Sequence, residues 1–233
     1  MYLETFICLP AGVPSCSQTQ GLLQRIFEEY RWFQPIRYGY ASLKKRIDPD
    51  RIDYDALIAF YDEWKSITVA ARTDQDYVLF DPARPGVPPY TGSITWKTSA
   101  KGTNTLAWRA SHLRQVTEIM QWVGSPLAQS GFAKDFQRKS SRVVPAEDGV
   151  GQQEVLTIRD YSEGLTGVYW RNFFGPPFVR LFGERLAALP PGCIKEELEG
   201  GIVLVQPYEL PMLAGTPEGI ARERPPIVHL GPE

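Results

Sequence analysis

The stretch GLTGVYWRNFFGPPFVRLFGERLAALPPG, residues 164–192, decides the fold that we expect. From Gly167 to Phe174, aromatic and β-branched residues fall on alternate sides, which is the period-two pattern of a core strand. Gly175 lets the backbone turn, and the two prolines after it suit the first turn of a helix. Apolar residues then recur at helical spacing until Pro190. The stretch therefore predicts a strand, a sharp corner and a helix.

Other segments extend this pattern in both directions. Leu3 to Leu9 predicts a first strand, and 154–159 predicts a strand that forms a hairpin with the strand at 167–174. A second hairpin is expected from Cys193–Leu198 and Ile202–Gln206. Helical spacing indicates helices over 17–33, 53–64, 111–123, 126–136 and 216–224, the last ended by Pro225 and Pro226. We therefore expect an α+β fold, mainly an antiparallel sheet packed against several helices.

The length favours a single globular domain over residues 1–233. The polar, glycine-bearing segment 146–153 is the best internal boundary, but it is too short for a long linker. It predicts a loop within one fold or a seam between two similar layers.

Charge and hydropathy exclude two classes of partner. The 25 basic and 27 acidic residues give a net charge of -2, so no global charge marks a nucleic-acid binder. No apolar run approaches 18 residues, and MYLETFICLPAG has neither the basic start nor the long apolar core of a signal peptide. We expect a cytoplasmic protein that binds neither nucleic acid nor a membrane.

Cysteines and histidines give no sign of a metal or cofactor. Cys8, Cys16 and Cys193 are odd in number and lack paired metal spacing, which indicates reduced and mostly buried thiols. His112 and His229 lie far apart, without a second histidine at i+4. We therefore expect no metal site and no cofactor.

Acidic residues gather in the segment from Asp48 to Glu63, where Arg51 is the single base. The acids are Asp48, Asp50, Asp53, Asp55, Asp62 and Glu63. Acids in the first turn of a helix complement its positive end, so Asp53 and Asp55 can be explained as capping residues. The alternative is an acidic face for a basic partner. A second acidic group is Glu196, Glu197 and Glu199.

Catalytic motifs are not evident. The sequence has no nucleophile elbow, zinc motif or paired catalytic spacing. A lone histidine such as His112, without an obvious nucleophile partner, is usually structural. Carboxylate enzymes need not show a motif, so a small carboxylate-dependent hydrolase stays open as an alternative.

The order Tyr-Trp-Arg-Asn-Phe-Phe-Gly-Pro-Pro-Phe-Val-Arg-Leu-Phe-Gly, residues 169–183, is followed by a helix and a glycine-linked strand pair. With this order of residues and elements, the last third of the chain resembles bacterial polymorphic-toxin immunity proteins, in particular immunity protein family 52 and related immunity domains. The resemblance implies a non-enzymatic, cytoplasmic α+β protein. It would bind and block a toxin, often a nuclease, that a neighbouring cell delivers in interbacterial competition, as type VI secretion does. It supplies no catalytic residues.

Two functions are therefore expected from different classes. The first is an immunity protein whose exposed acids occlude the active site of a cognate toxin. The second is the carboxylate-dependent hydrolase. For the first, the acids of 48–63 and of 196–199 are the candidate partner-binding residues.

Overall fold

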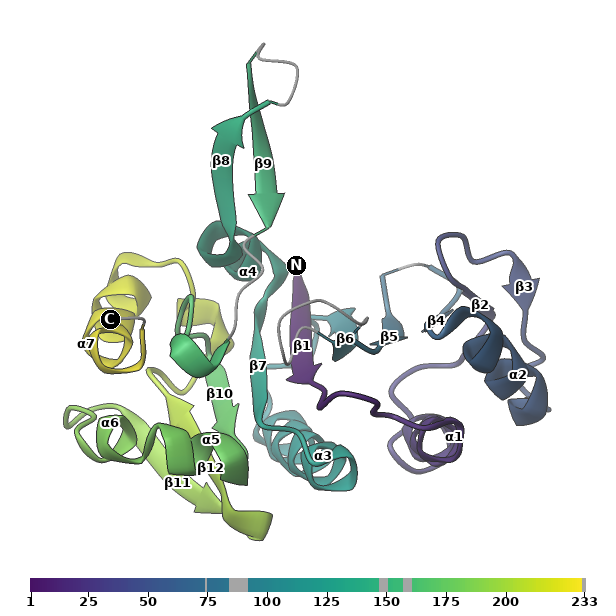
Figure 1. Ribbon diagram of the computed structural model, residues 1–233, viewed down its shortest axis with the longest axis horizontal. Helices are drawn as coiled ribbons and strands as arrows, with labels where there is room; N and C mark the ends of the chain where they lie inside the picture. Colours follow the sequence, from purple (N-terminus) through teal and green to yellow (C-terminus); the bar gives the residue numbers. More distant parts are fainter. Residues whose placement is uncertain (74, 84–91, 147–150, 157–160, 232–233) are drawn as a thin grey trace.

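The computed structural model describes residues 1–73, 75–83, 92–146, 151–156 and 161–231. Its main feature is a ten-stranded sheet in the order β11-β12-β10-β7-β1-β6-β5-β4-β2-β3, in which all neighbouring strands are antiparallel (Figure 1). The strands are β1 (Tyr2–Cys8), β2 (Arg37–Gly39), β3 (Lys45–Arg46), β4 (Ile67–Ala70), β5 (Tyr77–Asp81), β6 (Ser93–Ser99), β7 (Leu127–Phe132), β10 (Arg171–Phe174), β11 (Ile194–Leu198) and β12 (Ile202–Gln206). The predicted α+β class is confirmed.

Helices pack on both faces of this sheet. They are α1 (Cys16–Gln24), α2 (Tyr54–Trp64), α3 (Leu106–Val123), α4 (Ala133–Ser140), α5 (Pro176–Leu181), α6 (Gly183–Ala187) and α7 (Pro217–Leu230). A π-helical turn, Arg25–Glu29, continues α1, and short 3-10 turns span Tyr161–Glu163, Glu199–Gly201 and Pro211–Leu213. Ser15 caps α1, and the side chain of Gln18 completes the capping box.

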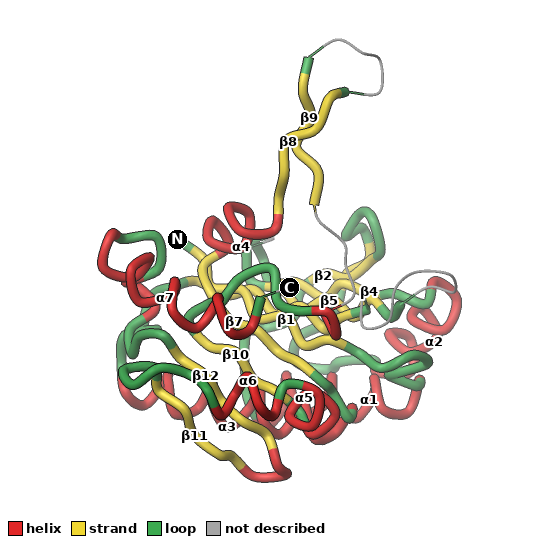
Figure 2. The backbone as a smooth tube through the Cα atoms, turned by 60° about the vertical axis from the view of Figure 1, so that its left-hand side comes forward, coloured by secondary structure: helices red, strands yellow, loops and turns green. Residues whose placement is uncertain are grey.

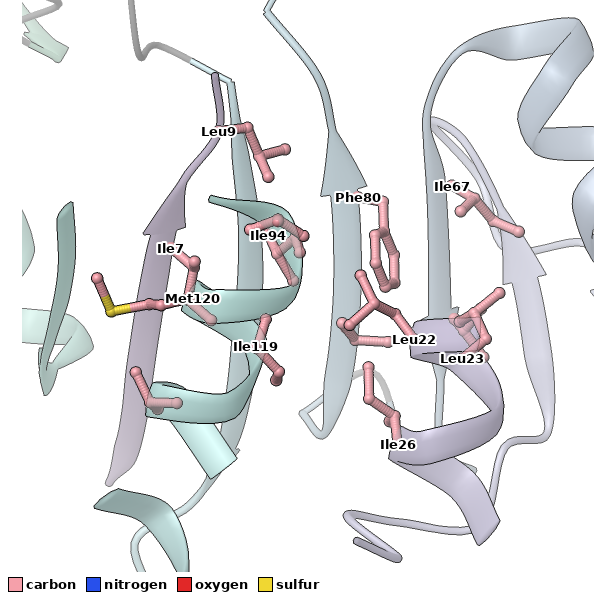
Figure 3. Close-up of a cluster of buried hydrophobic side chains, with 14 of the residues drawn as sticks. Ile7, Leu9, Leu22, Leu23, Ile26, Ile67, Phe80, Ile94, Ile119 and Met120 are labelled. Atoms are coloured by element: carbon pink, nitrogen blue, oxygen red, sulfur yellow. The ribbon is translucent and has the colours of Figure 1, made fainter. Parts of the chain in front are cut away.

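Successive residues of each strand face opposite sides, and this alternation separates two cores. On one face, Ile7 and Phe173 pack with apolar residues of α1, α2 and α3. On the other, Cys8 and Phe174 pack with α5, α6 and α7. Figure 3 shows the first core, where Leu22, Leu23 and Ile26 of α1 and its continuation meet Phe80 and Ile67 of the sheet.

The stretch 164–192 forms a strand, a corner and helices, as predicted. The strand is shorter than expected and begins at Arg171. The side chain of Asn172 accepts a hydrogen bond from the Tyr169 amide at 3.0 Å and donates one to the Tyr169 carbonyl at 2.9 Å. Because these bonds satisfy the backbone of Tyr169 locally, the ladder does not extend to it. The helix is divided into α5 and α6 at Phe182, just before Gly183.

The expected hairpin between 154–159 and the strand at 167–174 is wrong. The strand β10 pairs with β7 and β12. Residues 152–156 form β9 (Gln152–Leu156), which pairs with β8 (Ser141–Pro145) in a separate two-stranded sheet. Short loops favour this local pairing over one with a more distant strand. Figures 1 and 2 show the β8–β9 hairpin projecting away from the ten-stranded sheet beyond α4.

The expected boundary at 146–153 falls at the tip of this hairpin. Residues 147–150 lie outside the described part of the chain. Strands from before and after the segment, β1 and β10, both pair with β7 in the same sheet. The organisation as one domain or two similar layers stays a prediction.

The helix expected over 126–136 is wrong for its first half. Residues 127–132 form β7, which lies between β1 and β10 and is buried at every position. A strand enclosed on both faces carries no alternating pattern, so its sequence does not distinguish it from a buried helix. Only from Ala133 onward is the chain helical, as α4.

The last helix is longer than predicted. The helix α7 begins after its cap Thr216, as expected, but runs through Pro225 and Pro226 to Leu230. Pro226 and Leu230 are buried, and the Leu230 carbonyl accepts a hydrogen bond from Leu165 at 2.8 Å. Tertiary packing therefore holds a helical path that local propensity disfavours.

Candidate functional site

The two groups of predicted acids lie at opposite ends of the sheet. The segment from Asp48 to Glu63 runs from the connection after the edge strand β3 into α2. Glu196 and Glu197 belong to the other edge strand, β11, and Glu199 lies in the turn after it. Figure 1 shows α2 and β11 on opposite sides of the molecule. The acids therefore form two separate surfaces, and their role in binding stays a prediction.

Two of the acids beside α2 also serve the backbone. Asp53 caps the helix by accepting a hydrogen bond from the Ala56 amide at 3.0 Å. Asp48 accepts one from the Asp50 amide at 3.1 Å. Asp55 lies in the first turn, where its charge complements the helix dipole.

Bases reduce the acidic character of this end. Lys65 forms an ion pair with Asp62, and this hydrogen bond holds the pKa of Asp62 below its usual range. The Nζ atom of Lys45 lies 4.9 Å from the centre of the Phe60 ring of α2. The surface around α2 is therefore mixed in charge. The charged residues counted within 48–63 did not show this, because Lys45 and Lys65 lie outside that segment.

The acids of β11 are exposed along an unpaired edge. Charged side chains on an edge strand also discourage pairing with other chains, so this arrangement has a structural explanation as well. Glu196 also acts on the buried Arg171. Burial and then the charge of Arg109 lower the pKa of Arg171, and the charge of Glu196 partly opposes them.

His112 lies in α3, two turns after the cap Thr105, and not beside the helix start as expected. Its Nδ1 accepts a hydrogen bond from Arg171 Nη1 at 2.9 Å, because a guanidinium can only donate. The ring proton therefore sits on Nε2, which lies 3.0 Å from Thr5 Oγ1. Burial, and then the charge of Arg171, hold the pKa of His112 well below that of a free histidine.

The partners of His112 form one row across four neighbouring strands. In register, Trp96, Thr5, Ser130 and Arg171 follow one another on β6, β1, β7 and β10. Thr5 Oγ1 and Ser130 Oγ lie 3.0 Å apart. Every member of the row is buried, so the neutral histidine acts here as a bridge between α3 and the centre of the sheet.

Arg171 is a buried cation that forms no ion pair within the described residues. It donates to His112 and to the Arg109 carbonyl at 2.9 Å, and its guanidinium lies 4.3 Å from the Trp170 ring centre. Burial, followed by the nearby charge of Arg109, lowers the pKa of Arg171 to about 9. The side chain stays charged at neutral pH.

A first cleft, of about 450 Å³, opens beside His112 and is lined by three tryptophans. Trp32 lies parallel to Trp96 with ring centres 3.8 Å apart, and Trp108 stacks on His112 at 5.0 Å. Trp32 Nε1 donates to Gln115 Oε1 at 2.9 Å, which fixes the ring. This tryptophan cleft, defined by Trp32, Trp96 and Trp108, presents the residue type in which binding energy often concentrates.

A second cleft, of about 520 Å³, lies between the start of α1, the end of α2 and the end of β5. We call it the α1–α2 cleft, and its lining includes Cys16, Tyr61, Trp64, Lys65, Ser66 and Asp81. Tyr61 Oη donates to the Pro14 carbonyl at 2.7 Å, which ties α2 to the loop before α1. Cys16 Sγ lies 3.4 Å from Asp62 Oδ1, and burial and that carboxylate raise the pKa of the thiol.

No family model and no curated protein matches this chain. A solved structure of the Pseudomonas aeruginosa T6SS protein PA0821 is similar in fold. The TM-score is 0.53 at 10% sequence identity, over 99% of this chain and 73% of that one. At this identity the similarity shows the fold alone. The chain therefore shares its fold with a protein of the type VI secretion system.

Other groups give no further site. The three cysteines are free, and burial raises the pKa of Cys8 to about 12 and of Cys193 to about 11. Among the described residues no group of three His, Cys, Asp or Glu could hold a metal ion. In the same part of the chain, no helix is long and apolar enough to cross a membrane.

Sequence reasoning missed both clefts. Their residues come from segments far apart in the chain, as Cys16, Trp64 and Asp81 show. The one available signal was the number of aromatic residues, which the sequence assigned to the core. The core strand expected at 167–174 is confirmed for Trp170, which is buried, whereas Trp64 is 51% exposed.

Proposed function

We propose that this protein is a cytoplasmic immunity protein that binds a cognate bacterial toxin and neutralises it by occluding the toxin's active site. The observation that carries the proposal is the fold similarity to a T6SS protein. The resemblance of residues 169–183 to immunity proteins points the same way. A toxin that acts on nucleic acid needs a basic cleft for the phosphate backbone, which an inhibitor can cover with carboxylates.

The arrangement of His112 supports binding over catalysis. Both ring nitrogens are engaged, the ring is buried, and its low pKa leaves it neutral. A general base must reach the proton that it abstracts, and both nitrogens of this ring are already engaged by Thr5 and Arg171. No observation among the described residues favours the hydrolase alternative.

The test is to co-express this protein with the product of the gene next to its own, and then to mix the two purified proteins. We expect toxin-producing cells to survive only when they also make this protein. In the mixing experiment, toxin activity should fall in proportion to the added protein until the two proteins are equimolar. An inhibitor that acts by occupancy needs one molecule per toxin. Protection at a small fraction of the toxin concentration would instead indicate a catalytic protein, and no protection at any ratio would reject the proposal.

A further inference from the structure

The α1–α2 cleft combines negative charge, an exposed aromatic face and an unused hydrogen-bond acceptor. We propose that it binds a lysine or arginine side chain of the partner protein, with Asp81 as the counter-charge and Trp64 as the aromatic surface. This inference rests on the proposed function, because it names the chemistry with which the toxin would be held.

Asp81 supplies charge that no described residue neutralises. It ends β5, is half-buried, and forms no ion pair with another described residue. Lys65 is the one base among the described residues of the lining, and it pairs with Asp62. A carboxylate that is partly removed from water and lacks a cation favours binding of one from outside.

Trp64 supplies a flat surface for that cation. Trp64 is 51% exposed, so part of its surface is open to a ligand. Tyr40 stacks on it at 6.0 Å, with 19° between the planes, and Phe60 stacks on it at 6.0 Å, with 26°. The ring is therefore held in place before any partner arrives. Guanidinium and ammonium groups bind favourably over the face of tryptophan.

Ser66 gives an independent reason to expect a ligand with a hydrogen-bonding group. Its hydroxyl is buried, lines the cleft and has no hydrogen-bond partner. Buried polar atoms without partners are rare in folded proteins. The N–H groups of a guanidinium or ammonium would supply the missing partner.

An anion fits the cleft less well. The start of α1 lies in the lining and would attract negative charge, but the capping box already engages the amides of Ser15 and Gln18 there. Lys65 is engaged by Asp62. Among the described residues of the lining, the charged group without a partner of opposite charge is the carboxylate of Asp81.

The first experiment uses the protein alone with N-acetyl-argininamide, and N-acetyl-citrullinamide as its uncharged isostere. The indole N–H resonance of Trp64 is followed by NMR, after assignment with Trp64→Phe. We expect saturable, millimolar binding of the arginine compound and at least about tenfold weaker binding of the citrulline compound. Asp81→Asn should weaken arginine binding about tenfold, and Asp55→Asn, outside the cleft, should not change it. Equal binding of the two compounds, or no loss with Asp81→Asn, would overturn the inference.

The second experiment measures Kd for the toxin. Asp81→Asn and Trp64→Leu should each raise Kd about tenfold or more. Glu184→Gln, at an exposed acid of α6 outside the cleft and outside both acidic groups, should change Kd by less than about threefold. Melting temperatures show that the variants are folded. If wild-type protein binds the toxin and both cleft variants bind it equally well, this inference fails and the proposed function stands. If wild-type protein binds no toxin, the proposed function fails, and the arginine titration still decides whether the cleft takes a cation.

Discussion

Nδ1 of His112 accepts a hydrogen bond from Nη1 of Arg171 at 2.9 Å, so that a neutral ring meets a buried cation at the centre of the sheet. Protonation of the ring would remove this bond and place two positive charges side by side. Within the described residues, no carboxylate pairs with Arg171 to offset them. The fold therefore depends on His112 staying neutral.

The stability of the protein should fall in weak acid because of this pair. Below about pH 6.5 the unfolded chain takes up a proton on His112 that the folded protein does not, since the folded pKa is lowered. The contribution of neutral His112 to the free energy of unfolding is fully present above about pH 6.5. It declines by up to about 1.4 kcal/mol per pH unit as the pH falls toward the pKa of His112 in the folded protein. Urea unfolding at several pH values measures it.

The matched variant is His112→Gln, whose amide can also donate and accept hydrogen bonds. The difference in pH dependence between the wild-type protein and this variant isolates the histidine. Identical slopes would contradict the prediction. His112→Gln and His229→Ala should both keep toxin binding, and loss of function in either with a normal melting temperature would favour the enzyme alternative.

Trp170→Ala should destabilise the protein by about 3–5 kcal/mol. The side chain is fully buried, its Nε1 donates to the Glu209 carbonyl at 2.9 Å, and its ring lies against Trp108. Denaturant unfolding measures the change. Leu181→Ala is the control, because Leu181 is 54% exposed and should cost less than about 1 kcal/mol. A Trp170→Ala protein of normal stability would show that this core is assigned wrongly.

Gly175→Ala and Gly183→Ala should have opposite effects. A Cβ at Gly175 would lie 2.0 Å from the Ser125 carbonyl oxygen, so backbone at the corner must move, at a cost of about 3 kcal/mol or more. At Gly183 nothing lies within 4 Å, and alanine should stabilise α6 by about 0.5–1 kcal/mol. Thermal unfolding of both variants compares them directly, and equal effects would refute the assigned corner.

The acids beside α2 should act mainly on the rate of toxin association. Replacing Asp48, Asp50 and Asp55 with asparagine and Asp53 with serine removes four charges but keeps a capping side chain. At low salt we expect association to slow about tenfold, with a smaller effect at physiological salt because screening shortens the reach of surface charges. Stopped-flow measurements at both salts test this.

The matched comparison replaces Glu196, Glu197 and Glu199 with glutamine at the opposite edge. If the α2 variant binds at an unchanged rate and the β11 variant does not, the interface lies at the other end of the sheet. Unchanged rates in both would remove the predicted acids from the interface.

Local patterns predicted much of the fold. The strand β1, the hairpin of β11 and β12, and the helix α2 with its cap Asp53 each carry their signal in consecutive residues. The pattern is absent in β7, where burial on both faces removes alternation. In α7, packing overrides two prolines. Sequence also could not place the row from Trp96 to Arg171, because pairing between distant strands brings those residues together.

The first strand of the chain occupies the middle of the sheet. Residues 2–8 pair on one side with β6 and on the other with β7, so both ladders require segments that lie roughly a hundred residues downstream. During synthesis, β1 cannot pair with β6 until Ser99 has emerged from the ribosome, and it cannot pair with β7 until Phe132 has emerged. Contacts between residues so far apart in the sequence form slowly. Strand edges that stay open can associate with other chains. The yield of soluble protein should therefore respond more strongly to the speed of translation and to chaperones than the stability of the finished fold would suggest.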